Sequence, residues 1–227
     1  MVVAVLDSGV HRSHPHVGGI LSARAVAEYP DAVDVLGHGT AVAAAIHEKA
    51  PDAGIQVVKV FHRTLSSTIT TLLEGMEMAS AQGARLVNLS LGTWKEEHAP
   101  LLQRAVDVAR ERGCLVVSAL EREGVTWYPG ALDGVVSVVM DPRYPRDGIR
   151  VEPHGEGFRI AASGFPRPIP GVPPERNLNG VSFAVANTTG VLARLLEGRP
   201  EIVDWSALHT LIREGEPPFR EPPLPCG

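Results

Sequence analysis

Short apolar runs alternate along this chain with longer segments of helical period. Val2 to Leu6 is apolar at every position and Ile55 to Val60 is mostly apolar without a strict alternation, as expected of strands buried on both faces of a parallel sheet. Thr68 to Gln82 and Pro100 to Arg112 instead repeat their apolar residues every three or four positions, which predicts helices. We predict further strands at Arg85 to Leu89, Leu115 to Ala119 and Val135 to Val139, and further helices at Ser182 to Leu196 and Asp204 to Arg213. Such alternation predicts an α/β fold, a three-layer α/β/α sandwich with a mostly parallel central sheet.

The chain of 227 residues is long enough for one sizeable core. We predict one domain over residues 1–213, followed by a Pro-rich C-terminal tail over 214–227. Asp141 to Arg176 is rich in Pro and Gly, so we expect it to cover the surface with a single strand at Phe158 to Ala162. The tail carries five prolines and is expected to be extended.

The composition is that of a globular protein and excludes several classes of function. The formal net charge of -5 provides no basic footprint for nucleic acid and no polybasic patch for a membrane. No apolar stretch approaches the roughly 20 residues of a membrane span, and the run after Met1 lacks the basic lead of a secretion signal. Cys114 and Cys226 could pair, but two cysteines do not make a disulfide framework. We therefore expect a cytoplasmic protein in which Cys114, near a strand, is a buried thiol.

Three polar side chains stand at the ends of expected elements. Asp7 follows the first strand, His38 stands between two glycines ahead of a small apolar run, and Ser182 begins the last long apolar helix. Each also has an ordinary structural interpretation: a turn after a strand for Asp7, a loop histidine for His38, and a helix N-cap for Ser182. Ligands on parallel sheets bind beyond the carboxyl ends of the strands, which favours a shared site for the three.

The three residue types are those of a nucleophilic triad. A serine hydroxyl becomes a good nucleophile when a neighbouring imidazole removes its proton, and a carboxylate fixes the tautomer of that imidazole. The start of a helix adds free backbone N–H groups and a positive dipole end, which would stabilise an oxyanion beside Ser182. The chain order Asp7, His38, Ser182 is one of the orders in which such triads occur.

At these residues the sequence resembles the subtilisin-like peptidases, or subtilases. The resemblance covers Val2 to about Leu196 and rests on the segments that match the family's aspartate, histidine and serine motifs: Val3 to Val10 with Ser13 to Pro15, Gly37 to Ala43, and Asn179 to Ala184. It implies a subtilisin-like fold with Asp7, His38 and Ser182 as the catalytic residues.

A further segment, Val87 to Gly92, resembles the family strand that pairs with the substrate backbone and borders the pocket for the residue before the scissile bond. The resemblance therefore implies substrate binding at Ser90, Leu91 and Gly92. The segment Trp127 to Ala131 is similar to the family's Tyr-Pro-Ala turn near the specificity pocket.

The chain also departs from the family pattern. Ala41 replaces the second histidine of the histidine motif, Val181 replaces the threonine before the nucleophile, and Ala186 replaces a proline. More seriously, Ser118 to Gly124 contains no asparagine where the family places the side chain that donates to the oxyanion. Arg122 is a candidate replacement because a guanidinium only donates, although a surface pair with Glu121 or Glu123 is the more common fate.

Other family features are also missing from the sequence. It shows no obvious propeptide and no recognisable calcium loops, so we expect neither a metal site nor a cofactor. A partner subunit is one way in which such a chain would be helped to fold.

Two classes of function follow. The first is a serine endopeptidase that acts through an acyl-enzyme, and a narrower version of it processes a dedicated peptide such as a biosynthetic precursor. The alternative is a catalytically weakened, subtilase-like peptide-binding or regulatory subunit, which the missing asparagine favours and the intact triad opposes. An esterase or a peptide ligase would use the same triad. In each case we expect a peptide or protein partner and neither nucleic acid nor membrane.

Overall fold

The computed structural model describes residues 1–155, 157–173, 176–202 and 204–214. In this part of the chain, eight strands form one sheet in the order β2-β3-β1-β4-β5-β8-β10-β9. Their bounds are β1 Val2–Asp7, β2 Ile20–Ala25, β3 Gly54–Lys59, β4 Leu86–Leu89, β5 Leu115–Ala119, β8 Val135–Met140, β9 Ile149–His154 and β10 Gly157–Ala162. All neighbours pair in parallel except β9, which runs antiparallel to β10.

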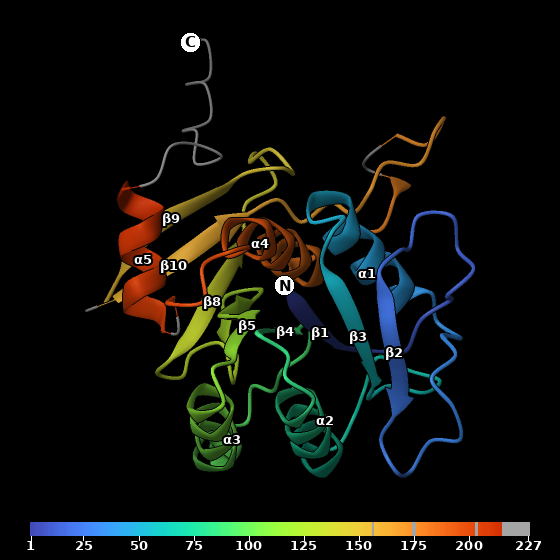
Figure 1. Ribbon diagram of the computed structural model, residues 1–227, viewed down its shortest axis with the longest axis horizontal. Coiled ribbons are helices and arrows are strands. Elements are labelled where there is room, and N and C mark those ends of the chain that lie inside the picture. Colours follow the sequence, from blue (N-terminus) through green and yellow to red (C-terminus); the bar gives the residue numbers. More distant parts are fainter. Residues whose placement is uncertain (156, 174–175, 203, 215–227) are drawn as a thin grey trace.

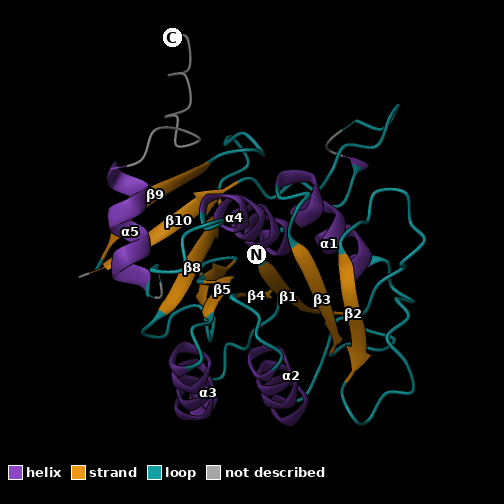
Figure 2. Cartoon of the chain, viewed as in Figure 1, coloured by secondary structure: helices purple, strands orange, loops and turns teal. Residues whose placement is uncertain are grey.

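Helices cover both faces of the sheet (Figures 1 and 2). The helices are α1 His38–Lys49, α2 Ile69–Ala81, α3 Ala99–Glu111, α4 Val181–Leu195 and α5 Trp205–Glu214, with a short 3-10 helix at Glu96–His98. In Figure 1, α1 and α4 lie on one face and α2 and α3 on the other, which makes the predicted three-layer α/β/α sandwich. The α/β fold class and its mostly parallel sheet are thus confirmed.

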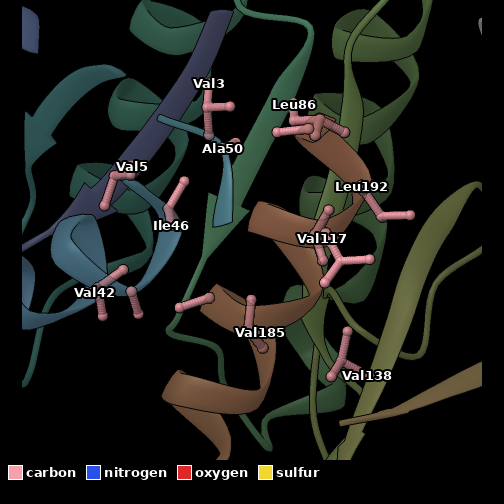
Figure 3. Packing of buried hydrophobic residues seen from close by; sticks show 14 of the residues in the cluster. Val3, Val5, Val42, Ile46, Ala50, Leu86, Val117, Val138, Val185 and Leu192 are labelled. Atoms are coloured by element: carbon pink, nitrogen blue, oxygen red, sulfur yellow. The ribbon is translucent and has the colours of Figure 1, made fainter. Parts of the chain in front are cut away.

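Two apolar clusters hold the layers together. The cluster under α1 and α4 joins residues such as Val5 and Val117 of the sheet to Ile46 of α1 and Val185 of α4 (Figure 3). The second cluster lies under α2 and α3 on the opposite face. Because the central strands are buried on both faces, their apolar runs are continuous rather than alternating. Cys114 belongs to the second cluster, as a buried free thiol whose pKa is raised by burial.

The helix α5 packs at the β9–β10 end of the sheet. The ring of its His209 stacks on Phe158 of β10 at a centroid distance of 3.5 Å, and Leu208 is fully buried in the cluster under α1 and α4. Arg85 donates from its guanidinium to the carbonyls of Leu196 and Ile202, which fixes the connection between α4 and α5.

The expected elements agree with the structure to within one residue at each end. The prediction of a single strand within residues 141–176 is wrong, because β9 precedes β10 there. The edge strand β2 was not predicted either. The tail over 214–227 lies outside the described residues from Gly215 onward, as does Cys226. None of the helices in the described ranges has the length and apolar character needed to cross a membrane.

Candidate active site

Asp7 is the last residue of β1, at the carboxyl end of a strand in the middle of the sheet. Its side chain is fully buried. The oxygen Oδ1 accepts hydrogen bonds from the backbone N–H of Ser8 at 2.8 Å and from Nδ1 of His38 at 2.7 Å. The second oxygen is buried without a partner among the described residues. Asp7 therefore fixes the His38 ring with Nδ1 protonated, which leaves Nε2 as the acceptor.

His38 is the first residue of α1. Glycine is required on each side of it, for a different structural reason at each position. Gly37 adopts the left-handed conformation, with a φ of 79°. At Gly39 an added Cβ would lie 2.3 Å from the carbonyl oxygen of Gly9, so only glycine fits the close approach of α1 to the end of β1. These contacts place the imidazole beside Asp7, with 14% of its side chain exposed.

The pKa of His38 is raised above its usual value. Burial alone would lower this pKa, but the hydrogen bond that His38 donates to Asp7 and the negative charges of Asp7 and Asp34 outweigh burial. A base with a raised pKa accepts a proton more readily, which suits an imidazole that must take a proton from a hydroxyl.

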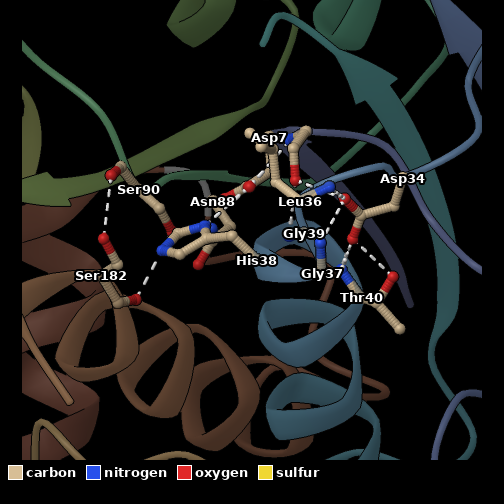
Figure 4. Close-up of polar contacts among 11 residues, drawn as sticks. Asp7, Asp34, Leu36, Gly37, His38, Gly39, Thr40, Asn88, Ser90 and Ser182 are labelled. Atoms are coloured by element: carbon tan, nitrogen blue, oxygen red, sulfur yellow. Dashed lines mark hydrogen bonds and ion pairs between the residues drawn. The ribbon is translucent and has the colours of Figure 1, made fainter. Parts of the chain in front are cut away.

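Ser182 is the second residue of α4, and the N-cap position is Gly180. The interpretation of Ser182 as an N-cap is therefore wrong. Its hydroxyl donates to the backbone carbonyl of Ser90 at 3.2 Å. The next residue, Phe183, holds its ring 5.6 Å from that of His38. Figure 4 shows the His38 ring between Asp7 and Ser182, so the structure brings together the three residues singled out by the sequence.

A buried carboxylate that the sequence motifs do not single out organises this region. Asp34 accepts hydrogen bonds from the Ser8 hydroxyl at 2.8 Å, from the backbone N–H of Gly37 at 2.8 Å, and from both the N–H and the hydroxyl of Thr40. It thus ties the residue after Asp7 to the residues on both sides of His38. In the sequence, the only indication of this role was that Asp34 precedes a helix N-terminus, where a carboxylate is favourable.

A second buried network supports Ser90. The side chain of Asn88, at 0% exposure, donates from Nδ2 to the Ser90 hydroxyl at 2.9 Å and accepts from the Thr189 hydroxyl at 3.0 Å. The Ser90 hydroxyl in turn donates to the carbonyl of Ser182 at 3.4 Å. This network fixes β4 against α4, and therefore fixes the strand end beside the nucleophile candidate.

A cleft of about 440 Å³ opens in front of His38 and Ser182. Ser90, Leu91 and Gly92 all line it, as the resemblance implies. At Gly92 an added Cβ would lie 2.8 Å from Cε3 of Trp127 and 2.6 Å from the carbonyl oxygen of Tyr128. The two chain segments that form this wall therefore touch, and glycine is required between them.

Arg122 lies in a small hairpin directly after β5, formed by β6 Glu121–Arg122 and β7 Val125–Thr126. The two turn residues, Glu123 and Gly124, both have positive φ, as in the tight turns that suit hairpins. Nε of Arg122 lies 3.6 Å from Oε1 of Glu123, the expected surface pair. Arg122 also lines the cleft, so it stands at the same opening as His38 and Ser182.

The described ranges contain no group of three or more His, Cys, Asp or Glu residues arranged to hold a metal ion. The site combines a buried carboxylate, an imidazole bonded to it, and a serine at the start of a helix that faces a cleft. On a parallel α/β/α sheet in the order Asp, His, Ser, these features define the subtilisin-like class of serine hydrolases.

Comparison with known proteins agrees with this class. The sequence model of the subtilase family matches residues 1–139. Subtilisin Savinase from Lederbergia lenta is 32% identical over 218 residues, which cover 90% of this chain and 78% of that protein. M-protease from Shouchella clausii is also 32% identical over 218 residues and 90% of this chain, but the chain spans only 55% of its length. The chain belongs to the subtilase family of subtilisin-like serine proteases.

Solved structures show the same fold. A lanthipeptide protease superposes with a TM-score of 0.70 at 20% identity, covering 97% of this chain and 81% of that one. The prenylagaramide maturation protease PagA has a TM-score of 0.67 at 24% identity, with coverage of 96% and 79%. The nisin leader peptidase NisP from Lactococcus lactis has a TM-score of 0.71 at 17% identity, with coverage of 96% and 83%.

Proposed function

We propose that this protein is a serine endopeptidase in which Ser182 is the nucleophile, His38 the general base and Asp7 the residue that orients His38. The observation that carries the proposal is the 2.7 Å hydrogen bond between Asp7 and His38 at the cleft that Ser182 also lines. A buried carboxylate bonded to an imidazole beside a serine is the arrangement that activates a hydroxyl.

The reaction begins with a rotation of the Ser182 side chain. In the free protein the hydroxyl donates to the carbonyl of Ser90, and catalytic hydrogen bonds commonly form only when substrate is bound. The hydroxyl turns toward Nε2 of His38, which takes its proton as Oγ attacks the scissile carbonyl. The imidazolium then protonates the leaving amine, and water activated by His38 hydrolyses the acyl-enzyme.

The oxyanion formed during attack needs hydrogen-bond donors. The backbone N–H of Ser182 lies in the first turn of α4, where N–H groups have no partner within the helix. Arg122 is the candidate for the donor that an asparagine supplies in the family pattern, because it lines the same cleft. Loss of one such donor costs about 10²–10³ in rate.

The substrate would bind in extended form beside Ser90, Leu91 and Gly92, with main-chain hydrogen bonds for affinity and the cleft for selectivity. Processing of a dedicated peptide is supported by proteins with the same fold, among them a lanthipeptide protease and the prenylagaramide maturation protease PagA. Digestion of casein tests this point, because rapid cleavage at many sites contradicts a dedicated substrate.

Labelling with a fluorophosphonate probe tests the catalytic assignment. The adduct is mapped by mass spectrometry, with Ser182→Ala as the control and circular dichroism to show that both proteins are folded. We expect modification at Ser182 alone. A folded protein that is not labelled would contradict the proposal and favour the alternative, a peptide-binding or regulatory subunit, which the absence of an asparagine in residues 118–124 supports.

A further inference from the structure

We propose that the cleft beside Ser182 selects peptides that carry an acidic side chain before the scissile bond, and that Arg122 and Lys95 make this selection. The inference rests on the proposed function for the direction in which the peptide lies.

The cleft is cationic although the chain as a whole is acidic. Lys95 and Arg122 line it, together with His98 and the candidate base His38. Among the described residues that line this cleft, none is an aspartate or a glutamate. The chain carries 26 acidic and 21 basic side chains. A cleft whose only carboxylate-binding charges are those of Lys95 and Arg122, with no acidic side chain in the described lining, therefore contrasts with the rest of the molecule. A peptide carboxylate that entered the cleft would meet positive charge only, and would be attracted by it.

Arg122 contacts the wall of the cleft through Trp127, while 59% of its side chain is exposed to solvent. Its guanidinium carbon lies 5.7 Å from the centre of the Trp127 ring, within the range of a cation–π contact. Trp127 in turn packs against Gly92, the residue of the proposed substrate strand that cannot carry a Cβ. The charge is therefore positioned next to the strand along which the peptide would lie.

Lys95 belongs to the same wall. Its backbone N–H donates to the Thr93 hydroxyl at 3.1 Å, and Thr93 pairs in a β-bridge with Tyr128, the residue after Trp127. The side chain of Lys95 is exposed and makes no ion pair in the described part of the chain. Its charge is thus free to meet a ligand.

The carboxylates close to these cations do not neutralise the cleft. Glu123, which pairs with Arg122 at 3.6 Å, is 84% exposed, and an exposed pair of this kind is weak. Glu97 lies 3.9 Å from His98 and is also exposed. Neither carboxylate lines the cleft. A peptide that covers the wall would exclude water from Arg122 and strengthen its attraction for a peptide carboxylate.

The uncharged residues that line the cleft determine which side chains the peptide should carry beside the acidic one. This part of the lining combines hydroxyl side chains with apolar ones, and besides Trp127 its large apolar members are Phe61, Leu65, Ile69, Leu72, Leu91 and Trp94. Leu65 and Trp94 are more than half exposed, so a ligand that covered them would remove apolar surface from water. The preferred peptide segment therefore combines an acidic residue with apolar neighbours.

Binding to the Ser182→Ala variant tests the preference without any need for catalysis. Fluorescein-labelled decapeptides of one apolar sequence, with Glu, Gln or Lys placed in turn at each of several positions, are titrated by fluorescence anisotropy. We expect the best Glu peptide to bind about tenfold more tightly than its Lys counterpart at low salt, and this ratio to fall at high salt. Equal affinities of the Glu and Lys peptides at every position would overturn the proposal.

A matched pair of charge reversals assigns the effect to the cleft. Arg110 on α3 resembles Arg122 in exposure and in its pair, since its guanidinium lies 3.6 Å from Asp107, but it does not line the cleft. In the Ser182→Ala background, Arg122→Glu should invert the preference between Glu and Lys peptides, and Arg110→Glu should leave it unchanged. An equal effect of the two reversals would show that net charge alone is responsible and would refute the proposal.

Hydrolysis by the protein with Ser182 in place separates selection from oxyanion stabilisation. If Arg122 selects the substrate, Arg122→Gln lowers kcat/KM more for Glu peptides than for Lys peptides, so that the ratio between the two falls. A uniform loss of kcat for all peptides would assign Arg122 to the oxyanion alone. A protein that fails fluorophosphonate labelling but binds acidic peptides would contradict the proposed function only. A labelled protein without charge preference would contradict this inference only.

Discussion

Asp34 and Thr40 are joined by two hydrogen bonds to one carboxylate oxygen, from the backbone N–H of Thr40 at 2.8 Å and from its hydroxyl at 2.6 Å. The other oxygen of Asp34 accepts from Ser8 and from the backbone of Leu36 and Gly37. One buried carboxylate therefore holds the start of α1 against the end of β1. The relative position of Asp7 and His38 depends on it.

We predict that Asp34→Asn lowers the free energy of unfolding by about 2–4 kcal/mol, because an NH2 group, which only donates, replaces one of the two oxygens that accept these bonds. Urea denaturation measures the loss, and Asp52→Asn, at an exposed position, is the control. The rate of fluorophosphonate labelling should fall as well, since His38 is no longer held. Unchanged stability would show that Asp34 is dispensable.

The stability difference should also depend on pH. Burial raises the pKa of Asp34, but the hydrogen bonds from Thr40, Ser8 and Leu36 outweigh burial and leave the pKa below its usual value. A lowered folded-state pKa stabilises the protein above the unfolded-state value of about 4 and loses this effect as the pH falls through the folded-state value. The difference between wild type and Asp34→Asn should therefore be largest near neutral pH and shrink below about pH 4.

A second prediction concerns the pH dependence of catalysis. Because the pKa of His38 is raised by Asp7 and Asp34 against the effect of burial, kcat/KM should rise through an apparent pKa above about 6.5 as the imidazolium loses its proton. Asp7→Asn should move this pKa down and lower kcat by up to about 10⁴, because the wrong tautomer is stabilised. Asp34→Asn should move it in the same direction.

The interaction between Asp7 and His38 also contributes to stability. Its dependence on pH has the opposite sign to that of Asp34. A raised folded-state pKa of His38 stabilises the protein below the unfolded-state value of about 6.5, and this effect is lost as the pH rises through the folded-state pKa. NMR titration of the His38 ring in Ser182→Ala measures the pKa directly. A value below that of a free histidine would contradict the interpretation.

The sequence sufficed to predict the central elements, and the reason is burial. Strands such as β1 and β5 are apolar on both faces, so their residue patterns are unambiguous. The two strands of the central sheet that were missed, β2 and β9, form its edges, and the short β6–β7 hairpin was missed as well. Edge strands are half exposed and carry polar side chains, as Ser22 and Arg24 do in β2, and β9 even contains Pro153.

The sequence also predicted the three central residues of the candidate site, but not the buried polar residues that support them. Asp7, His38 and Ser182 stand at the ends of recognisable elements, so their types and order indicated a common site. Asp34 and Asn88 were missed because each looks like an ordinary polar residue in a loop or strand. Their importance lies in contacts with Thr40 and Thr189, and sequence periodicity carries no information about such contacts.

The next prediction concerns Arg85, whose guanidinium donates to three backbone carbonyls ahead of α5, those of Leu196, Arg199 and Ile202. Arg85→Gln should lower the free energy of unfolding by about 1.5–3 kcal/mol and accelerate hydrogen exchange in α5. Hydrogen exchange with mass spectrometry measures this, with Arg63→Gln at an exposed position as the control. Exchange in α5 that stays as slow as in wild type would contradict the anchoring role.

The adjacent residues Thr188 and Thr189 provide a matched test of the buried network behind Ser90. Both are fully buried, but the Thr189 hydroxyl donates to Asn88 at 3.0 Å, whereas the Thr188 hydroxyl has no partner among the described residues. Thr189→Val should lower the free energy of unfolding by about 1–3 kcal/mol, because the oxygen of Asn88 is left unpaired.

Thr188→Val makes the same chemical change one position earlier, and it should be neutral or stabilising because it removes an unpaired buried hydroxyl. Urea denaturation of both variants measures the contrast. Thr189→Val should in addition slow labelling of Ser182. Asn88 also donates a hydrogen bond to the Ser90 hydroxyl, and the carbonyl of Ser90 accepts one from the Ser182 hydroxyl. Equal losses of stability in the two variants would mean that methyl packing, rather than the hydrogen bond to Asn88, sets the cost at this pair of positions.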